Sequence, residues 1–163
     1  MTFKRHAYIA TILVALFSMA VSANSEDLKI KSDNQDLNYN NNTMYFKGNV
    51  VVSQGPISIK ADELFVDTQD GTGEKLIAKG SPALFTQIDE ENGNLTAKAN
   101  EIEYFVTTQT LKLSGDAKFK QGGSEVQSGS IEFDLAKKRV KADGDASTGG
   151  RVTTTIKTKK KNG

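Results

Sequence analysis

The chain has 163 residues, a formal net charge of +1, and apolar and charged residues at 37% and 25% of its composition. It contains no cysteine and a single histidine, His6, so it has no disulfide, no thiol nucleophile, and no set of histidine or cysteine metal ligands. This inventory and the near-neutral charge argue against a nucleic-acid-binding protein, and we expect no enzymatic activity and no cofactor.

The first 23 residues are typical of a secretory signal peptide. Lys4 and Arg5 precede an apolar run over residues 7–20, and Val21-Ser22-Ala23 places small residues at a cleavage site. The run is shorter than the roughly 20 residues that a membrane-spanning helix needs. We therefore predict cleavage after Ala23 and export, with a retained membrane anchor as the alternative. Loss of Lys4 and Arg5 lowers the net charge from +1 to about −1.

Residues 24–157 are expected to form one all-β domain, followed by a lysine-rich tail over residues 158–163. No segment after residue 24 shows a convincing helical period, whereas a period of two recurs along the chain. Apolar and polar residues alternate over residues 28–32 and again over residues 44–53. Gln54-Gly55-Pro56 then supplies a turn, and the alternation of apolar and polar residues resumes at Ile57.

The alternation changes phase at Asp62-Glu63, just before Leu64-Phe65-Val66. A phase change of this kind predicts a β-bulge or tight corner that leads the strand into a neighbouring sheet. The two carboxylates are also candidates for acid–base chemistry, as are those of Asp89-Glu90-Glu91. We interpret both groups as solvated turn residues, and residues 67–73, which resemble a calcium loop in composition only, as a loop.

The strand–turn–strand pattern of residues 44–67 recurs at intervals of about thirty residues, as in stacked repeat proteins. A looser copy spans residues 76–102, where the register of Leu84 and Phe85 is ambiguous. A third spans residues 111–133, and residues 138–144 resemble the start of a fourth. Because one face of each strand is apolar, the pattern predicts two facing antiparallel sheets about 10 Å apart.

In both terminal strands of this stack, residues 28–32 and 151–157, apolar and polar residues alternate and proline is absent. Exposed edges of this kind can pair with a strand of another chain. Joining unlike ends is a heterologous contact that produces a linear head-to-tail oligomer. The alternative is a monomer in which the lysines of these strands block the edges.

Four segments carry a resemblance to a known family: Ile30-Lys31-Ser32-Asp33, residues 46–55 with Ile59-Lys60-Ala61-Asp62, Pro82-Ala83-Leu84-Phe85, and Arg151-Val152-Thr153-Thr154. Together they resemble the LptA family of periplasmic lipopolysaccharide transport proteins, also described by its OstA-like N-terminal domain. It implies a twisted, open β-jellyroll in the periplasm that binds lipopolysaccharide through lipid A. It further implies that LptC docks at the N-terminal edge and LptD at the C-terminal edge.

The resemblance also implies that acyl chains lie in a groove between the two sheets. The apolar positions that would line this groove are Leu28, Ile30, Met44, Phe46, Val50, Val52, Ile57, Ile59, Leu84, Phe85, Leu111, Leu113, Phe119, Ile131 and Phe133. The partner edges would be Leu28 and Ile30 at one end and Val152, Thr154 and Ile156 at the other. For each lining position, an ordinary dry core is the alternative interpretation.

Three other functions remain open at this stage. A membrane-anchored LptC-like protein would share the repeat but keep its N-terminal apolar segment. A polysaccharide-binding or adhesive module would expose aromatic platforms, and a glycosidase would need two carboxylates facing each other across a cleft.

Overall fold

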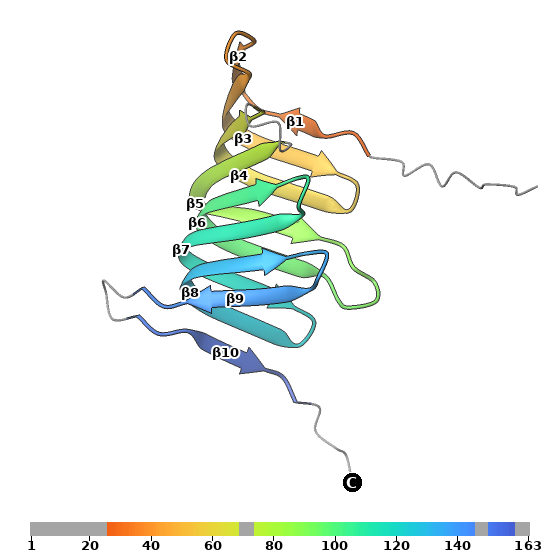
Figure 1. The fold of residues 1–163 in the computed structure, drawn as a ribbon, viewed down its shortest axis with the longest axis vertical. Helices are drawn as coiled ribbons and strands as arrows, with labels where there is room; N and C mark the ends of the chain where they lie inside the picture. Colours follow the sequence, from red (N-terminus) through yellow and green to blue (C-terminus); the bar gives the residue numbers. More distant parts are fainter. Residues whose placement is uncertain (1–25, 69–73, 146–149, 159–163) are drawn as a thin grey trace, which may run out of the picture.

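The computed structural model describes residues 26–68, 74–145 and 150–158, so the predicted signal peptide and most of the lysine-rich tail lie outside the described residues. Within these ranges the chain forms strands and no helix, which confirms the all-β prediction (Figure 1). No helix there is long and apolar enough to cross a membrane. The strands are β1 (Lys29–Lys31), β2 (Asn34–Asn38), β3 (Thr43–Gln54), β4 (Ile57–Asp67), β5 (Lys75–Gln87), β6 (Leu95–Phe105), β7 (Thr110–Gln121), β8 (Ser124–Asp134), β9 (Arg139–Asp143) and β10 (Thr153–Ile156).

All the strands belong to one ten-stranded antiparallel sheet rather than to two separate sheets. The long strands β3 to β8 each pair with the next strand in the chain, as the repeated hairpins predict. Short strands complete the two ends: β1 and β2 both pair with β3, and β9 and β10 both pair with β8. The sheet is not closed into a barrel, so its two terminal edges lie at opposite ends of the stack (Figure 1).

Each long strand bends near its middle, where the register shifts. In β3, Gly48 and Asn49 are inserted between the pairs Lys47↔Glu63 and Val50↔Ala61. Gly48 has a φ of 81° and Asn49 of 45°, a left-handed conformation that glycine and asparagine tolerate best. The bulge predicted at Asp62-Glu63 is confirmed, since the register against β5 shifts between Lys60 and Glu63, but β4 continues through the bend as one strand.

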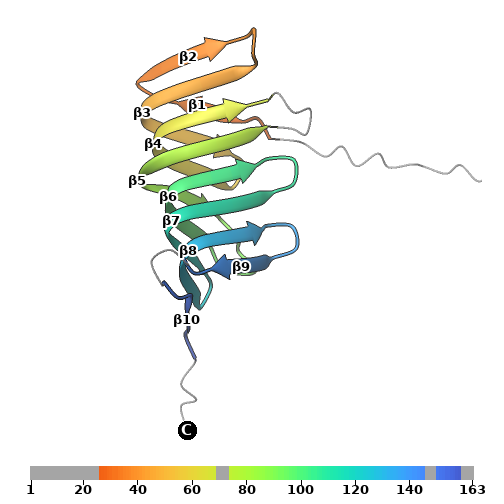
Figure 2. The same ribbon diagram turned by 60° about the vertical axis from the view of Figure 1, so that its left-hand side comes forward.

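The bends divide the sheet into two facing layers, which we call layers A and B. Figure 2 shows the strands turning from one layer to the other along one side of the stack. Layer A comprises β2, residues 43–47, 63–67, 75–79, 101–105, 110–114 and 130–134, and β9; layer B comprises β1, residues 50–54, 57–61, 83–87, 95–99, 117–121 and 124–128, and β10.

Aromatic side chains show that the inner faces of the layers meet. The ring of Phe85 in layer B lies 5.7 Å from that of Tyr104 in layer A, edge to face. Phe119 in layer B and Phe133 in layer A lie 4.6 Å apart, also between ring centroids. Such pairs contribute about 0.5–1.5 kcal/mol beyond the burial of their area. The layers are thus held together by contacts between residues far apart in the sequence.

On β4 to β7, the inward side chain of layer B next to the bend is an alanine, and a larger side chain lies farther out on each strand. Next to the bend, layer B carries alanines at positions 61, 83, 99 and 117, and farther out it carries larger residues such as Ile59 and Phe119. Small side chains let the two layers approach closely, whereas large ones hold them apart. The interior is therefore a wedge, narrow at the bend and wider toward the hairpin loops.

Candidate functional site

The predicted lining residues lie, with one exception, on the inward faces of the two layers. Buried to 5% exposure or less are Phe46, Val50, Val52, Ile59, Phe85, Leu111, Leu113, Phe119, Ile131 and Phe133, and Ile57 is 9% exposed. Leu28, Ile30 and Met44 are only partly buried and pack against this core at the N-terminal end of the stack. The inner faces thus form one continuous apolar cluster across the long strands.

Of the two alternatives left open by the ambiguous register, Phe85 faces inward and Leu84 does not. Leu84 is half-buried and lies opposite Lys60 and Lys98 on the outer face of layer B, whereas its neighbour Phe85 is fully buried. The cause is the bend of β5, where residues 80–82 lie between the pairs Lys79↔Glu101 and Ala83↔Ala99. The inward positions of β5 before the bend are Leu76 and Ala78. Because of the insertion, continuing this every-second-residue pattern past the bend would place Leu84 inside instead of Phe85.

The interior includes residues that the alternation alone did not identify. Val66, Leu76, Leu95, Ile102 and Tyr104 are each at most 2% exposed. Tyr104 faces inward because β6 also changes phase at its bend, between Lys98 and Glu101. A search for the phase change in every repeat, as at Asp62-Glu63, would have found these positions. Among the described residues no polar or charged side chain is buried.

The hairpin loops of both layers lie at the wide side of the wedge. Asp89, in the layer B loop between β5 and β6, accepts hydrogen bonds from the backbone N–H of Asn92 at 2.9 Å and of Glu91 at 3.1 Å. The bonds from Asn92, above all, lower the pKa of Asp89, and Lys138 in the loop between β8 and β9 adds a smaller electrostatic contribution. The hydrogen bonds from Glu91 and Asn92 thus order the layer B loop around the Asp89 carboxylate.

The terminal edges are more exposed than the interior. β1 spans three residues, Ile30 being half-buried, and every residue of β10 is exposed. Val152 precedes β10 at 41% exposure, and Ile156 reaches 67%. Both strands are shorter than predicted, and the alternation did not predict β2, whose sequence NQDLN is largely polar. Among the described strands, β1 pairs only with β3 and β10 only with β8, so each has one unpaired side.

The carboxylates considered for acid–base chemistry do not face one another in a cleft. Glu63 lies at the bend, 3.6 Å from the Lys47 Nζ in an exposed ion pair. Asp89 lies in a hairpin loop, where Asn92 holds its carboxylate. In the described ranges, no group of three or more acidic side chains is arranged to hold a metal ion.

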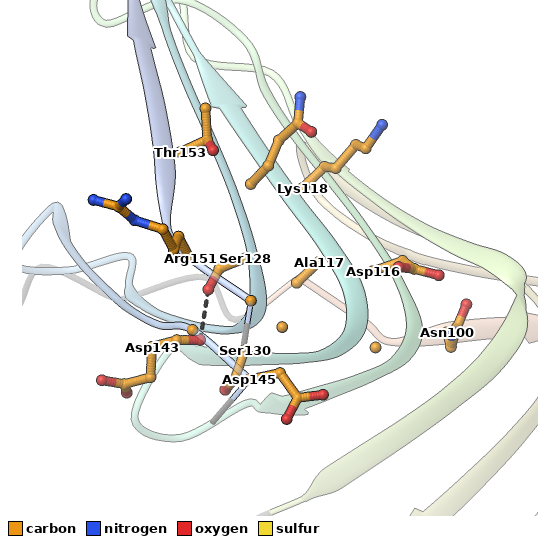
Figure 3. A pocket seen from close by; sticks show the side chains of 15 residues that line it. Asn100, Asp116, Ala117, Lys118, Ser128, Ser130, Asp143, Asp145, Arg151 and Thr153 are labelled. Carbon is orange, nitrogen blue, oxygen red and sulfur yellow. Dashed lines mark hydrogen bonds between the residues drawn. The ribbon is translucent and has the colours of Figure 1, made fainter. Parts of the chain in front are cut away.

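A polar pocket of about 730 Å³ lies at the C-terminal end of the bend (Figure 3). Figure 3 shows Arg151 and Asp116 on opposite sides of this pocket, and the Ser128 hydroxyl donates a hydrogen bond to the backbone oxygen of Asp143 at 2.5 Å. Glycines 115, 129, 144 and 150 form part of its wall. The sequence pattern did not indicate this pocket, because its walls come from strands and connections brought together by the bend.

Comparison with known proteins places this architecture in a family. Residues 29–139 match the family described as LptA/(LptD N-terminal domain) LPS transport protein. The lipopolysaccharide export system protein LptA of Haemophilus influenzae is 31% identical over 91% of this chain and 88% of its own length. The protein of the same name in Escherichia coli K12 is 30% identical over 85% of this chain and 76% of its own length.

A solved structure shows the same fold. The crystal structure of LptH, the LptA-homologous periplasmic component of the lipopolysaccharide transport device of Pseudomonas aeruginosa, superposes with a TM-score of 0.74. The match is 23% identical in sequence and covers 82% of this chain and 96% of LptH. Sequence and fold agree, and the protein belongs to the LptA/LptD N-terminal domain family of lipopolysaccharide transport proteins.

Proposed function

We propose that this protein is a periplasmic bridge component that binds lipopolysaccharide and carries it from the inner toward the outer membrane, with the acyl chains between layers A and B. The observation that supports this most directly is the uninterrupted apolar interior, which crosses every long strand without a buried polar side chain in the described residues. The relatives at 30% and 31% identity are lipopolysaccharide export proteins. A carrier needs no catalytic group.

The energetics of lipid transfer require an interior of this kind. Each methylene kept out of water contributes about 0.8 kcal/mol, so one acyl chain of about a dozen carbons gains on the order of 10 kcal/mol. A single deep site would trap the lipid, whereas repeated strands with similar Val, Ile, Leu and Phe linings offer sites of similar affinity. Direction must then come from another component of the transport system.

Lipid entry requires the layers to move apart, because side chains fill the interior. The rings of Phe119 and Phe133 are only 3% and 2% exposed and touch across the wedge. The wide side, where the hairpin loops of the layers lie, is the natural place for acyl chains to enter. The bend, with its alanines and its glycines at positions 48 and 115, would act as the hinge.

The unpaired strand edges support the partner assignments. We propose that LptC docks at the β1 edge, at Leu28 and Ile30, and that LptD docks at the β10 edge, at Val152, Thr154 and Ile156. A second copy would join β10 of one chain to β1 of the next, which continues the sheet and extends the apolar interior. A polysaccharide-binding module is less well supported, because Phe85, Tyr104, Phe119 and Phe133 are buried rather than displayed as platforms.

Site-specific photocrosslinking to lipopolysaccharide tests the location of the acyl chains. A photoreactive residue would replace Phe46 or Leu113, which face inward, and Lys47 or Lys112 as outward controls on the same strands. Crosslinks at the inward positions alone are the expected result. Crosslinks at the outward positions alone would place the lipid on the surface, and an absence of crosslinks at all positions would contradict the lipid-carrier function.

A further inference from the structure

The outer faces of the two layers differ in how their charges are partnered. On layer A, lysines and glutamates lie opposite one another on neighbouring strands, as in Lys75–Glu103 at 2.8 Å and Lys79–Glu101 at 3.2 Å. The pairs Lys47–Glu63 and Lys141–Glu132 continue the pattern at 3.6 and 3.8 Å. These four ion pairs, and Lys137–Asp134 at 3.0 Å, all lie on layer A or in its β8–β9 turn.

The outer face of layer B carries lysines that form none of these ion pairs, and among them only Lys120 lies opposite a glutamate, Glu125 on β8. The register places Lys31, Val51, Lys60, Leu84, Lys98 and Lys118 in one row across β1, β3, β4, β5, β6 and β7. Lys29 and Lys120 lie in the adjacent row, and all these lysines are exposed. In the described strand segments of layer B, the acidic residue is Glu125, which accepts a hydrogen bond from the Gln127 amide at 2.8 Å. We call this surface the basic face.

The basic face keeps an arrangement that disfavours folding. Lys98 and Lys118 lie directly opposite each other on β6 and β7, and like charges at such positions are destabilising. Layer A shows the alternative, because Lys79 on β5 lies opposite Glu101 on β6. A shallow depression of about 300 Å³ is lined by Thr96, Lys98, Lys118, Lys120 and Glu125. Negative charge supplied from outside the chain would relieve the repulsion.

The shape and chemistry of the basic face favour an extended anionic surface over a single anion. The row from β1 to β7 crosses five inter-strand spacings, which is about 24 Å. Lysines act as point charges and do not require the paired geometry with which arginine binds one phosphate. The aliphatic side chains of Val51 and Leu84 lie half-buried between the lysines. We propose that the basic face docks on the phosphate layer of a membrane that contains anionic phospholipids.

The predicted association is weak, reversible and sensitive to salt. Each lysine close to an anionic membrane strengthens partitioning by about fivefold. The attraction decays over about 10 Å at 0.1 M salt and about 3 Å at 1 M. Basic residues without a lipid anchor or an inserted apolar segment produce only such reversible binding. This docking is independent of acyl-chain binding, which occurs on the opposite side of layer B.

Vesicle sedimentation of the purified protein tests the proposal. Binding to vesicles of phosphatidylglycerol and phosphatidylcholine is compared with binding to phosphatidylcholine alone, at about 0.1 and 1 M salt. Lys98→Gln with Lys118→Gln is expected to weaken binding to the anionic vesicles by roughly 25-fold, from about fivefold per lysine. The matched control, Lys47→Gln with Lys79→Gln, makes the same charge change on layer A and is expected to leave binding unchanged.

Any of the following results would overturn the proposal. Equal losses for the two double variants would show that net charge alone drives binding. Equal binding to neutral vesicles would show that the apolar interior takes up acyl chains. Equally tight binding to heparin would show a general affinity for polyanions. The melting temperature of Lys98→Gln/Lys118→Gln should stay the same or rise, since a repulsion is removed, and a fall would make these lysines structural. Lipopolysaccharide crosslinking at Phe46 and Leu113 tests the transport function separately.

Discussion

Truncation of Phe119 measures how firmly the two layers are packed together. Phe119 is 3% exposed, and its ring centroid lies 4.6 Å from that of Phe133 in the opposite layer. Replacing a buried phenylalanine with alanine costs about 3–5 kcal/mol, which combines lost burial with the cavity left behind. Since whole domains are stable by about 5–15 kcal/mol, Phe119→Ala should remove a large part of the free energy of unfolding.

Urea unfolding of Phe119→Ala and of Lys120→Ala provides the comparison. Lys120 is the next residue on β7 but is exposed on the outer face, so its truncation should change the free energy of unfolding by less than about 0.5 kcal/mol. A loss below about 1 kcal/mol for Phe119→Ala would refute the packed interior. It would mean that the layers are already apart in solution.

The same variant links packing to lipid binding. If acyl chains enter between the layers, their carbons can fill the cavity left by the missing ring. Lipopolysaccharide should then raise the unfolding midpoint of Phe119→Ala by more than that of the wild-type protein, because a ligand stabilises the folded state according to its affinity. Equal shifts would place the lipid away from Phe119.

The other predictions concern the bend, the turns and the edge. Gly48→Ala should cost about 1–3 kcal/mol in urea unfolding, because φ is 81° and the new Cβ would lie 2.5 Å from the Asp33 carboxylate, whereas Gly123→Ala should change little. The backbone N–H and side chain of Lys137 lower the pKa of Asp134, so this carboxylate stabilises the fold above its unfolded-state pKa. That contribution should disappear as the pH falls through the lowered value, and an NMR titration midpoint of Asp134 at or above 3.8 would contradict it. We expect the full protein to form head-to-tail oligomers through β10, so a chain ending at Asp145, which lacks β10, should sediment as a monomer at the same concentrations; unchanged association would show that β10 is not the oligomer contact.

The hairpins were predictable from the sequence because they depend on local chemistry. Alternation at Met44, Phe46, Val50 and Val52 specifies which face of β3 is buried, and the turn at residues 54–56 specifies where the strand reverses. A period of two determines the inward face whatever surrounds the strand. The phase change at Asp62-Glu63 likewise marked a bend within its own strand.

Positions beyond a bend were less predictable, as Leu84 shows. How many residues a bulge inserts depends on the partner strand, and in β5 the insertion over residues 80–82 exchanged Leu84 and Phe85 between faces. The polar strand β2 was also not predicted, because its pairing with β3 rather than its own composition makes it a strand. Both outcomes follow from pairing between strands, which local patterns do not encode.

The sequence by itself determined an all-β chain of repeated hairpins with one apolar face, and family membership. Only the tertiary structure decided that one continuous sheet folds into two layers, that aromatic rings close the wedge between them, and that lysines distant in sequence share one outer face. The physical reason is that side-chain alternation is a property of a single strand. Register, bend alignment and cross-layer contact are properties of strand pairs, and they exist only once the chain has folded.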